Sequence, residues 1–157
     1  MKINWKKLVA AIIICQGTGL LAGLATASSV SSWYTTLDKP GFTPPNWLFA
    51  PVWTTLYFLM AIAAYLIWQK GIKTHGIKNA LLVFLLQLLL NGLWSIFFFG
   101  LRSPILGLID ILALIIVLIL TIVKFYKIHK VAAYLLVPYL VWVLYATALN
   151  VAIVVLN

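Results

Sequence analysis

The side chains of this chain that are best suited to chemistry are aromatic rings and amides repeated at helical spacing. Phe49, Trp53 and Tyr57 recur every fourth residue, which places them on one face of a helix. Two later stripes have helical spacing too: first Gln87, Asn91, Trp94, Ser95 and Phe98, then Tyr139, Trp142, Tyr145, Ala146 and Asn150. Indole and phenol faces can stack on a large flat aromatic ligand, and amides can hydrogen-bond to its polar edge. A single stripe of this kind more often packs against a neighbouring helix than binds a ligand. Whether the stripes form a binding site therefore depends on whether they lie at the same depth in the structure.

Asp110 is the one acidic residue inside a long apolar segment. A charge near the centre of a bilayer costs roughly 2.5–3.5 kcal/mol on insertion scales. The carboxyl group is therefore expected either to be protonated and face a cavity, or to pair with Arg102 or a side-chain amide. A structural role and a ligand-binding role both remain open. No second acid or base adjoins it, which argues against general acid–base catalysis.

Conventional catalysis and metal binding find little support in the sequence. Cys15 is the only cysteine, so no disulfide within the chain and no thiolate metal cluster are expected. His75 and His129 fall in short polar connections, away from the aromatic stripes, which argues against haem-iron ligation. The chain shows no nucleotide-binding loop and no Ser/His/Asp arrangement. We therefore expect no metal site and no tightly bound cofactor.

The elements that must position these residues are membrane-spanning helices. Of the 157 residues, 65% are hydrophobic and 8% are charged, whereas globular domains average about 25% charged residues. A soluble domain of this size cannot hide so much apolar surface, because folding removes only roughly 70% of the unfolded chain's surface from water. Backbone polar groups in lipid must be bonded internally. The sequence therefore predicts an all-α, multi-pass protein of the cell membrane.

Five segments are long enough to cross a hydrocarbon core, which takes about 20 apolar residues. They are Leu8–Val30, Leu48–Trp68, Asn79–Leu101, Pro104–Lys124 and Val131–Leu156. Three connections are short, but Ser31–Trp47 has seventeen residues. No repeat or flexible linker divides the chain, so we predict a single five-helix transmembrane domain over residues 1–157. Pro138 is expected to bend the fifth helix near the midplane by removing a backbone hydrogen bond.

The basic residues predict the orientation of the bundle. Nine of the eleven lysines and arginines fall on one side, namely Lys2, Lys6, Lys7, Lys70, Lys73, Lys78, Lys124, Lys127 and Lys130. Only Lys39 and Arg102 fall on the other side. By the positive-inside rule the N-terminus is cytoplasmic, and the long loop and the C-terminus lie outside. The net charge of +9 is therefore interpreted as a topology signal rather than as a surface for nucleic acid.

With this orientation, the polar and aromatic residues gather in the outer half of the bundle, whereas the inner half is mostly aliphatic. The residues at similar outer depths are Trp53, Tyr57, Asn91, Trp94, Asp110, Trp142 and Asn150. We therefore predict an outward-opening pocket. A loop longer than about 12–15 residues is usually functional or disordered, and this one is rich in aromatic residues and prolines. We expect it to pack over the pocket as an outer lid, with Trp47 as an anchor at the membrane interface.

Four stretches carry a recognisable pattern: WYTTLDKPGFTPPNWLFAPVWTTLY (Trp33–Tyr57), QLLLNGLWSIFFF (Gln87–Phe99), Asp110 in the fourth span, and PYLVWVLYATALN (Pro138–Asn150). Together they resemble the translocator protein family, also called the tryptophan-rich sensory protein or TspO/MBR family. The resemblance covers nearly the whole chain. It implies a five-helix bundle, commonly dimeric, that binds porphyrins and, in many members, benzodiazepine-type drugs and sterols.

The resemblance also implies a set of binding residues. Carried over by position, the family's pocket contacts correspond to Tyr34, Pro44, Trp53, Asn91, Trp94, Trp142 and Ala146. The helical stripes and the buried acid add Phe49, Tyr57, Ser95, Phe98, Asp110, Tyr139 and Asn150 as candidates. A metal-free porphyrin such as protoporphyrin IX is then the expected ligand or substrate. Residues 150–157 lack the tyrosine and basic residue of the animal sterol motif, so a dedicated sterol-import role is doubtful.

Three functional interpretations remain open. A porphyrin absorbs light, so Trp53 and Trp142 at its ring could support its light- and oxygen-dependent degradation or its sensing. The alternative is transmembrane transport of porphyrins or of lipids and sterols, although five helices without repeat-related halves are unusual for a transporter. The third is a membrane sensor or scaffold that acts through a partner. For the homodimer that the resemblance implies, Gly19 and Gly23 allow close helix contact, either between subunits or within one bundle.

Overall fold

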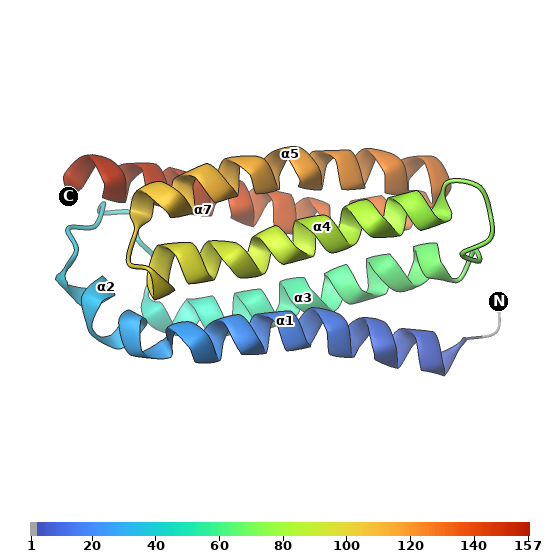
Figure 1. Cartoon of the computed structure of the whole chain (residues 1–157), viewed down its shortest axis with the longest axis horizontal. Helices are drawn as coiled ribbons and strands as arrows, with labels where there is room; N and C mark the ends of the chain where they lie inside the picture. The colour runs from blue at the N-terminus through green and yellow to red at the C-terminus, as the bar shows by residue number, and fades with distance from the viewer. Residues whose placement is uncertain (1–2) are drawn as a thin grey trace.

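The computed structural model describes residues 3–157 and shows five long helices running up and down in one bundle (Figure 1). The long helices are α1 (Trp5–Ser31), α3 (Asn46–Trp68), α4 (Ile77–Ser95), α5 (Pro104–Ile128) and α7 (Val137–Leu156). Three short elements complete the chain: α2 (Trp33–Thr36), the π-helix η1 (Ile96–Gly100) that continues α4, and α6 (Lys130–Tyr134) before α7. All five spans are long and apolar enough to cross a membrane. The predicted all-α bundle of five membrane-spanning helices is therefore confirmed.

Polar caps explain where several helices begin. The Asn4 side chain accepts a hydrogen bond from the backbone N–H of Lys7 at 3.2 Å, so α1 starts three residues earlier than the apolar run alone predicts. Ser103 caps α5 in the same way, and Pro104 follows it at the first helical position. These caps satisfy backbone donors at helix ends, where no intrahelical partner exists.

The fifth span is interrupted, but closer to one end than predicted. Helix α6 ends at Tyr134, two residues in a turn conformation follow, and α7 begins at Val137. Pro138 has no N–H to offer the carbonyl of Tyr134 four residues earlier, which explains the break at this point. The interruption therefore lies about a quarter of the way along the span rather than near its middle, because a proline acts on the turn that precedes it.

The two ends of the bundle differ in charge. The N-terminal side, the loop between α3 and α4, and the α5–α6 junction lie together at one end, here called the basic end (Figure 1). The α1–α3 connection, the α4–α5 turn with Arg102, and the end of α7 lie at the other, here called the loop end. The predicted grouping of the lysines is thus found, except for Lys2, which lies outside the described residues. Which end faces the cytoplasm stays a prediction.

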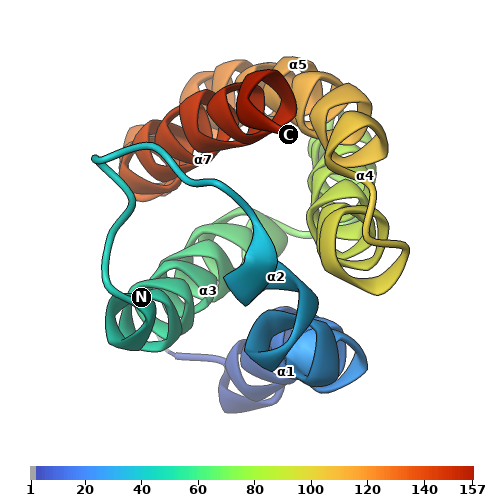
Figure 2. The ribbon, with the colours of Figure 1, turned by 90° about the vertical axis from the view of Figure 1, so that its left-hand side faces the viewer.

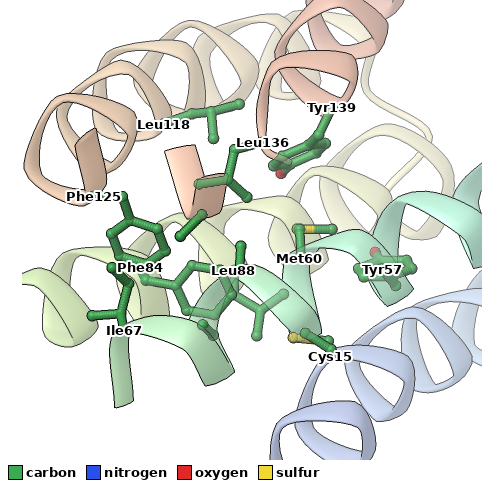
Figure 3. Packing of buried hydrophobic residues seen from close by; sticks show 14 of the residues in the cluster. Cys15, Tyr57, Met60, Ile67, Phe84, Leu88, Leu118, Phe125, Leu136 and Tyr139 are labelled. Carbon is green, nitrogen blue, oxygen red and sulfur yellow. The ribbon is translucent and has the colours of Figure 1, made fainter. Parts of the chain in front are cut away.

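Large buried apolar side chains fill the core toward the basic end. Ile67, Phe84, Leu118 and Phe125 are at most 2% exposed and belong to this part of the core (Figure 3). The rings of Phe84 and Phe125 stack at 5.7 Å. Close packing of this kind leaves little room for a ligand in this half of the bundle.

Helices α3 and α7 diverge toward the loop end. The backbone of α3 packs against α1, α4 and α6, but it makes few close contacts with α7. Viewed from the loop end, α3 and α7 stand apart, and residues 37–45 cross from α2 toward α7 before returning to α3 (Figure 2). Side chains rather than backbones must therefore fill the space between α3 and α7.

Candidate ligand-binding site

An aromatic cluster fills the space between α3 and α7, with Trp53 at its centre. The ring of Trp53 lies 5.7 Å from Tyr57, 6.3 Å from Tyr139 and 6.4 Å from Trp142, measured between ring centroids. The Trp53 and Trp142 rings are almost perpendicular, at 89°. Phe49 adds an edge contact to Trp142 at 6.1 Å. The predicted stripes on these two helices thus face each other, and we call these five residues the ring cluster.

Asn91 joins the ring cluster to α4. Its side-chain oxygen accepts a hydrogen bond from the Tyr57 hydroxyl, and its side-chain nitrogen donates to the Tyr139 hydroxyl at 2.9 Å. All three residues are buried. One amide therefore fixes the polar tips of two tyrosines from different helices, and it holds the floor of the ring cluster together.

Replacing Asn91 with leucine is expected to lower the free energy of unfolding by about 1 kcal/mol. The change leaves two buried hydroxyls without their partner, and interhelical hydrogen bonds in membrane proteins contribute about 0.6 kcal/mol each on average. Asn79→Leu, at an exposed position near the start of the same helix, is the matched control. Denaturant unfolding in detergent micelles measures both variants. Equal stabilities for the two would show that the tyrosines find other partners.

A second aromatic cluster lies beneath α2. Trp94 stacks on Phe98 at 5.4 Å, Phe98 contacts Phe99 at 4.7 Å, and Tyr34 meets Phe99 at 5.3 Å. Trp33 also contacts Phe98, at 5.8 Å. Burial raises the pKa of Tyr34, and the nearby Tyr145 phenol adds to the rise, so the Tyr34 hydroxyl stays neutral at physiological pH. This cluster holds α2 against the end of α4.

The polar groups of this second region are satisfied within the protein. The indole N–H of Trp94 donates to the Asn150 side-chain oxygen at 3.2 Å, and the Asn150 nitrogen donates to the Pro104 carbonyl at 2.8 Å. These contacts tie α4, α5 and α7 together. Trp94 and Asn150 therefore have a structural role, because they join three helices by hydrogen bonds. Their contact with a ligand stays a prediction from the sequence.

The π-helix η1 sets the position of Phe98. The Leu101 N–H reaches the Ile96 carbonyl at 2.8 Å, one residue further back than in an α-helix. Phe98 then packs directly on Gly107 of α5, where a Cβ atom would lie only 3.0 Å from two Phe98 carbons. The close approach of α5 to η1 therefore requires a residue without a side chain at position 107.

Three buried polar atoms have no hydrogen-bond partner among residues 3–157: Asp110 Oδ2, Gln87 Oε1 and Trp142 Nε1. The sequence left open a pairing of Asp110 with Arg102, but Arg102 is exposed and the two form no ion pair. Native proteins leave few buried polar groups unpaired. The Trp142 nitrogen and the Asp110 oxygen are therefore available to a ligand or to water.

Hydrogen bonds join the long loop to α7 and to Asn157 at its end, which agrees with the predicted position of the loop over the bundle. The Asn157 side chain accepts from the backbone N–H of Asp38 and donates to the Asp38 carbonyl, both at 3.0 Å. The Tyr145 hydroxyl donates to the Phe42 carbonyl at 2.5 Å, and the two rings lie 6.3 Å apart. These tethers hold residues 38–42 against α7 at the loop end. Trp47 points outward with 72% of its surface exposed, in keeping with the predicted interface anchor.

Two apolar grooves lie elsewhere on the surface. One of about 510 Å³ runs between α1 and α4 and includes the small residues Thr18, Ala22, Ala25 and Gly92. The other, of about 760 Å³, lies along α7 beside Pro40. Neither includes the ring cluster, whose rings contact one another in this structure. An open pocket among the rings therefore stays a prediction that requires some of them to move.

The remaining predicted residues take peripheral places. Pro44 in the lid, Ser95 at the end of α4 and Ala146 on α7 are all half-buried. Sequence reasoning did not select Trp33, Phe42, Phe99, Tyr145 or Asn157 as site residues. The helical stripe already contained Tyr145, and the aromatic run Phe97–Phe99 before a glycine could have pointed to the second cluster. Nothing in the sequence pointed to Asn157, because its partner lies 119 residues away.

Comparison with known proteins gives a consistent result. The profile of the TspO/MBR family matches residues 11–156. The chain is 51% identical to the tryptophan-rich protein TspO of Archaeoglobus fulgidus, over 99% of both chains. It is 42% identical to the protein of the same name from Chlorobaculum tepidum, over 96% of this chain and 98% of the relative. The human translocator protein is 40% identical over 75% of this chain and 70% of its own length.

Proposed function

The chain belongs to the TspO/MBR family, and from this premise we propose that it binds protoporphyrin IX between α3 and α7, with the macrocycle against Trp53 and Trp142. The observation that carries the proposal is the ring cluster: two perpendicular indoles and two hydrogen-bonded phenols beneath a tethered lid. Aromatic faces of this kind suit a flat macrocycle. The unpartnered N–H of Trp142 offers a donor to the ligand.

Binding at this place requires a local rearrangement. Trp53 and Trp142 are half-buried and contact each other, so a macrocycle can enter only if at least one ring turns aside. Few backbone contacts join α3 to α7 here, which allows such a movement without unfolding of the bundle. The closely packed half at the basic end would stay in place. Benzodiazepine-type drugs, being aromatic and smaller, fit the same proposal.

We further propose that bound protoporphyrin is degraded in light. The porphyrin is the light absorber and dioxygen is the second reactant, so the protein needs no tightly bound cofactor. The two indoles at the macrocycle are the oxidisable side chains nearest to it. Transport of porphyrins, lipids or sterols remains the alternative proposal. The tight core toward the basic end offers it no evident path.

A titration of protoporphyrin IX into the protein in the dark, followed by illumination in air and under argon, tests the proposal. We expect saturable binding with quenching of tryptophan fluorescence, and loss of the porphyrin absorption only with both light and air. Trp142→Ala should weaken binding by at least about fivefold, since a buried aromatic contact is worth about 1 kcal/mol. Full affinity in Trp142→Ala would place the ligand elsewhere.

We also propose that the protein forms a homodimer, as the family resemblance implies. The groove between α1 and α4 has small residues at its base, which would let a helix of a second copy approach closely. This assignment leaves the ring cluster free, because the groove is lined by α1 and α4 whereas the rings of the cluster belong to α3 and α7.

A further inference from the structure

The ammonium group of Lys39 is held in the lid without an anionic partner. Its Nζ donates to the carbonyls of Tyr34 at 2.9 Å and Leu37 at 3.0 Å, and it lies 4.9 Å from the centre of the Tyr34 ring. An ammonium has three N–H donors, so one remains. Among residues 3–157 Lys39 forms no ion pair. A half-buried cation of this kind is able to bind an anion.

The path of the lid places this cation across the loop end. Asp38, next to Lys39, is bonded to Asn157 at the end of α7. The Lys39 ammonium nevertheless reaches Tyr34, which packs on Phe98 and Phe99 at the end of α4. The backbone of residues 37–45 crosses the loop end between α2 and α7 (Figure 2). From this loop the Lys39 side chain turns back to Tyr34 of α2.

The ionisable groups differ between the two depths of the site, with an acid in the bundle and a lysine at the lid. Asp110, the only acid in the spans, is 6% exposed and forms no ion pair with any of the described residues 3–157. A carboxylate placed deep in the bundle would meet this acid and lose its hydration, whereas at the lid it would meet Lys39. Arg102, the other cation of the loop end, is exposed in the α4–α5 turn. The arrangement therefore favours a ligand with its anionic edge at the lid.

We propose that Lys39 is a specificity-determining residue that binds a carboxylate of the ligand and fixes its orientation, with the apolar ring edge toward Asn91 and the anionic edge under the lid. The ligand class is thus a flat aromatic ring system with carboxylates on one edge, and the two propionates of protoporphyrin meet this description. The inference rests on the proposed function, because it takes the ring system to lie between α3 and α7.

Comparing protoporphyrin IX with its dimethyl ester tests this inference. Both are titrated in the dark into the protein in phosphatidylcholine nanodiscs, whose lipid carries no net charge. We expect the parent to bind the free acid about tenfold more tightly than the ester, because hydrogen bonds to charged groups are stronger than neutral ones. Lys39→Gln keeps a donor for the Tyr34 and Leu37 carbonyls but removes the charge. It should lose this preference and leave ester binding unchanged.

Two further variants complete the experiment. Lys39→Arg should keep most of the preference for the free acid, and Arg102→Gln should bind both compounds as the parent does. Equal affinities of the parent for acid and ester would overturn the inference. So would an equal loss of both in Lys39→Gln, since Lys39 would then only hold the lid. If neither compound binds the parent, or if Trp142→Ala binds both unchanged, the proposed function itself fails.

Discussion

Replacing Trp53 and Trp142 together with phenylalanine is expected to slow the light-driven loss of bound protoporphyrin by at least about tenfold. Phenylalanine keeps an aromatic face but is far harder to oxidise than an indole. Binding should fall much less, by roughly threefold, because each aromatic contact is worth about 0.5–1.5 kcal/mol and most of it is retained. The measurement is the decay of the porphyrin absorption at saturating protein under constant light. Affinity is determined separately in the dark.

The two single variants should not be equivalent. The Trp53 and Trp142 rings stand at 89° to each other with centroids 6.4 Å apart. If the ring that turns aside to admit the ligand does not become parallel to the other, a planar macrocycle that stacks on one indole meets the other indole at its edge. The stacked indole has the larger contact with the π-system of the macrocycle, so one single substitution should account for most of the effect. The identity of that residue then gives the plane in which the macrocycle lies.

Trp47→Phe is the matched control for this prediction. Trp47 begins the same helix as Trp53, but 72% of its surface is exposed and it points away from the ring cluster. Its substitution should leave both binding and bleaching at the parental values. If the double variant also bleached the porphyrin at the parental rate, the indoles would have no part in the reaction. Bleaching would then be an intrinsic property of the bound porphyrin.

The architecture was largely predictable because lipid imposes simple rules on a chain. A span needs about 20 apolar residues and internal hydrogen bonds, so the five helices follow from hydropathy alone. The helix caps explain the small errors at the ends: Asn4 extends α1 beyond its apolar run. The proline rule predicted a bend near the middle of the fifth span, whereas the structure has a break closer to one end, since Pro138 acts on the turn before it.

The candidate site was predictable in composition but not in its internal pairing. Helical spacing puts Trp53, Tyr57 and Asn91 at a common depth, and the structure joins them. Spacing does not tell whether a polar group meets a ligand or another side chain. Trp94 and Asn150 bond to each other across two helices. The π-helix also changes the direction of Phe98, and a regular 3.6-residue period does not include such a turn.

The contacts of the lid were even harder to predict from the sequence than those of the ring cluster. A long loop rich in aromatic residues and prolines predicts packing, but the path of the loop depends on contacts distant in sequence. Asp38 is held by Asn157, and Phe42 by Tyr145. In the sequence, Lys39 contributed only to the charge distribution from which the membrane topology was predicted. Its position over Tyr34 depends on the path of the loop across the end of the bundle.

Substitution of Gly19 with alanine is expected to destabilise the bundle by about 1–3 kcal/mol relative to the same change at Gly23. A Cβ atom at position 19 would collide with the ring of Tyr57, whereas one at position 23 meets nothing within 4 Å. Forcing extra atoms into a packed contact typically costs 1–3 kcal/mol. Helix propensity changes equally at both sites, so the pair isolates the collision. Equal unfolding free energies in detergent would contradict the α1–α3 contact.

The position of Tyr57 makes this collision hard to relieve. Its ring packs against Trp53 at 5.7 Å, and its hydroxyl is bonded to Asn91, so the ring cannot turn aside without breaking the floor of the ring cluster. Gly19→Ala should therefore also weaken porphyrin binding, whereas Gly23→Ala should not. Combining Gly19→Ala with Tyr57→Leu should cost less than the sum of the two single changes, because the smaller side chain gives room to the new methyl group. If the two effects on the free energy of unfolding were strictly additive, α1 would instead have shifted away from α3. Gly19→Ala would then destabilise the bundle without displacing Tyr57.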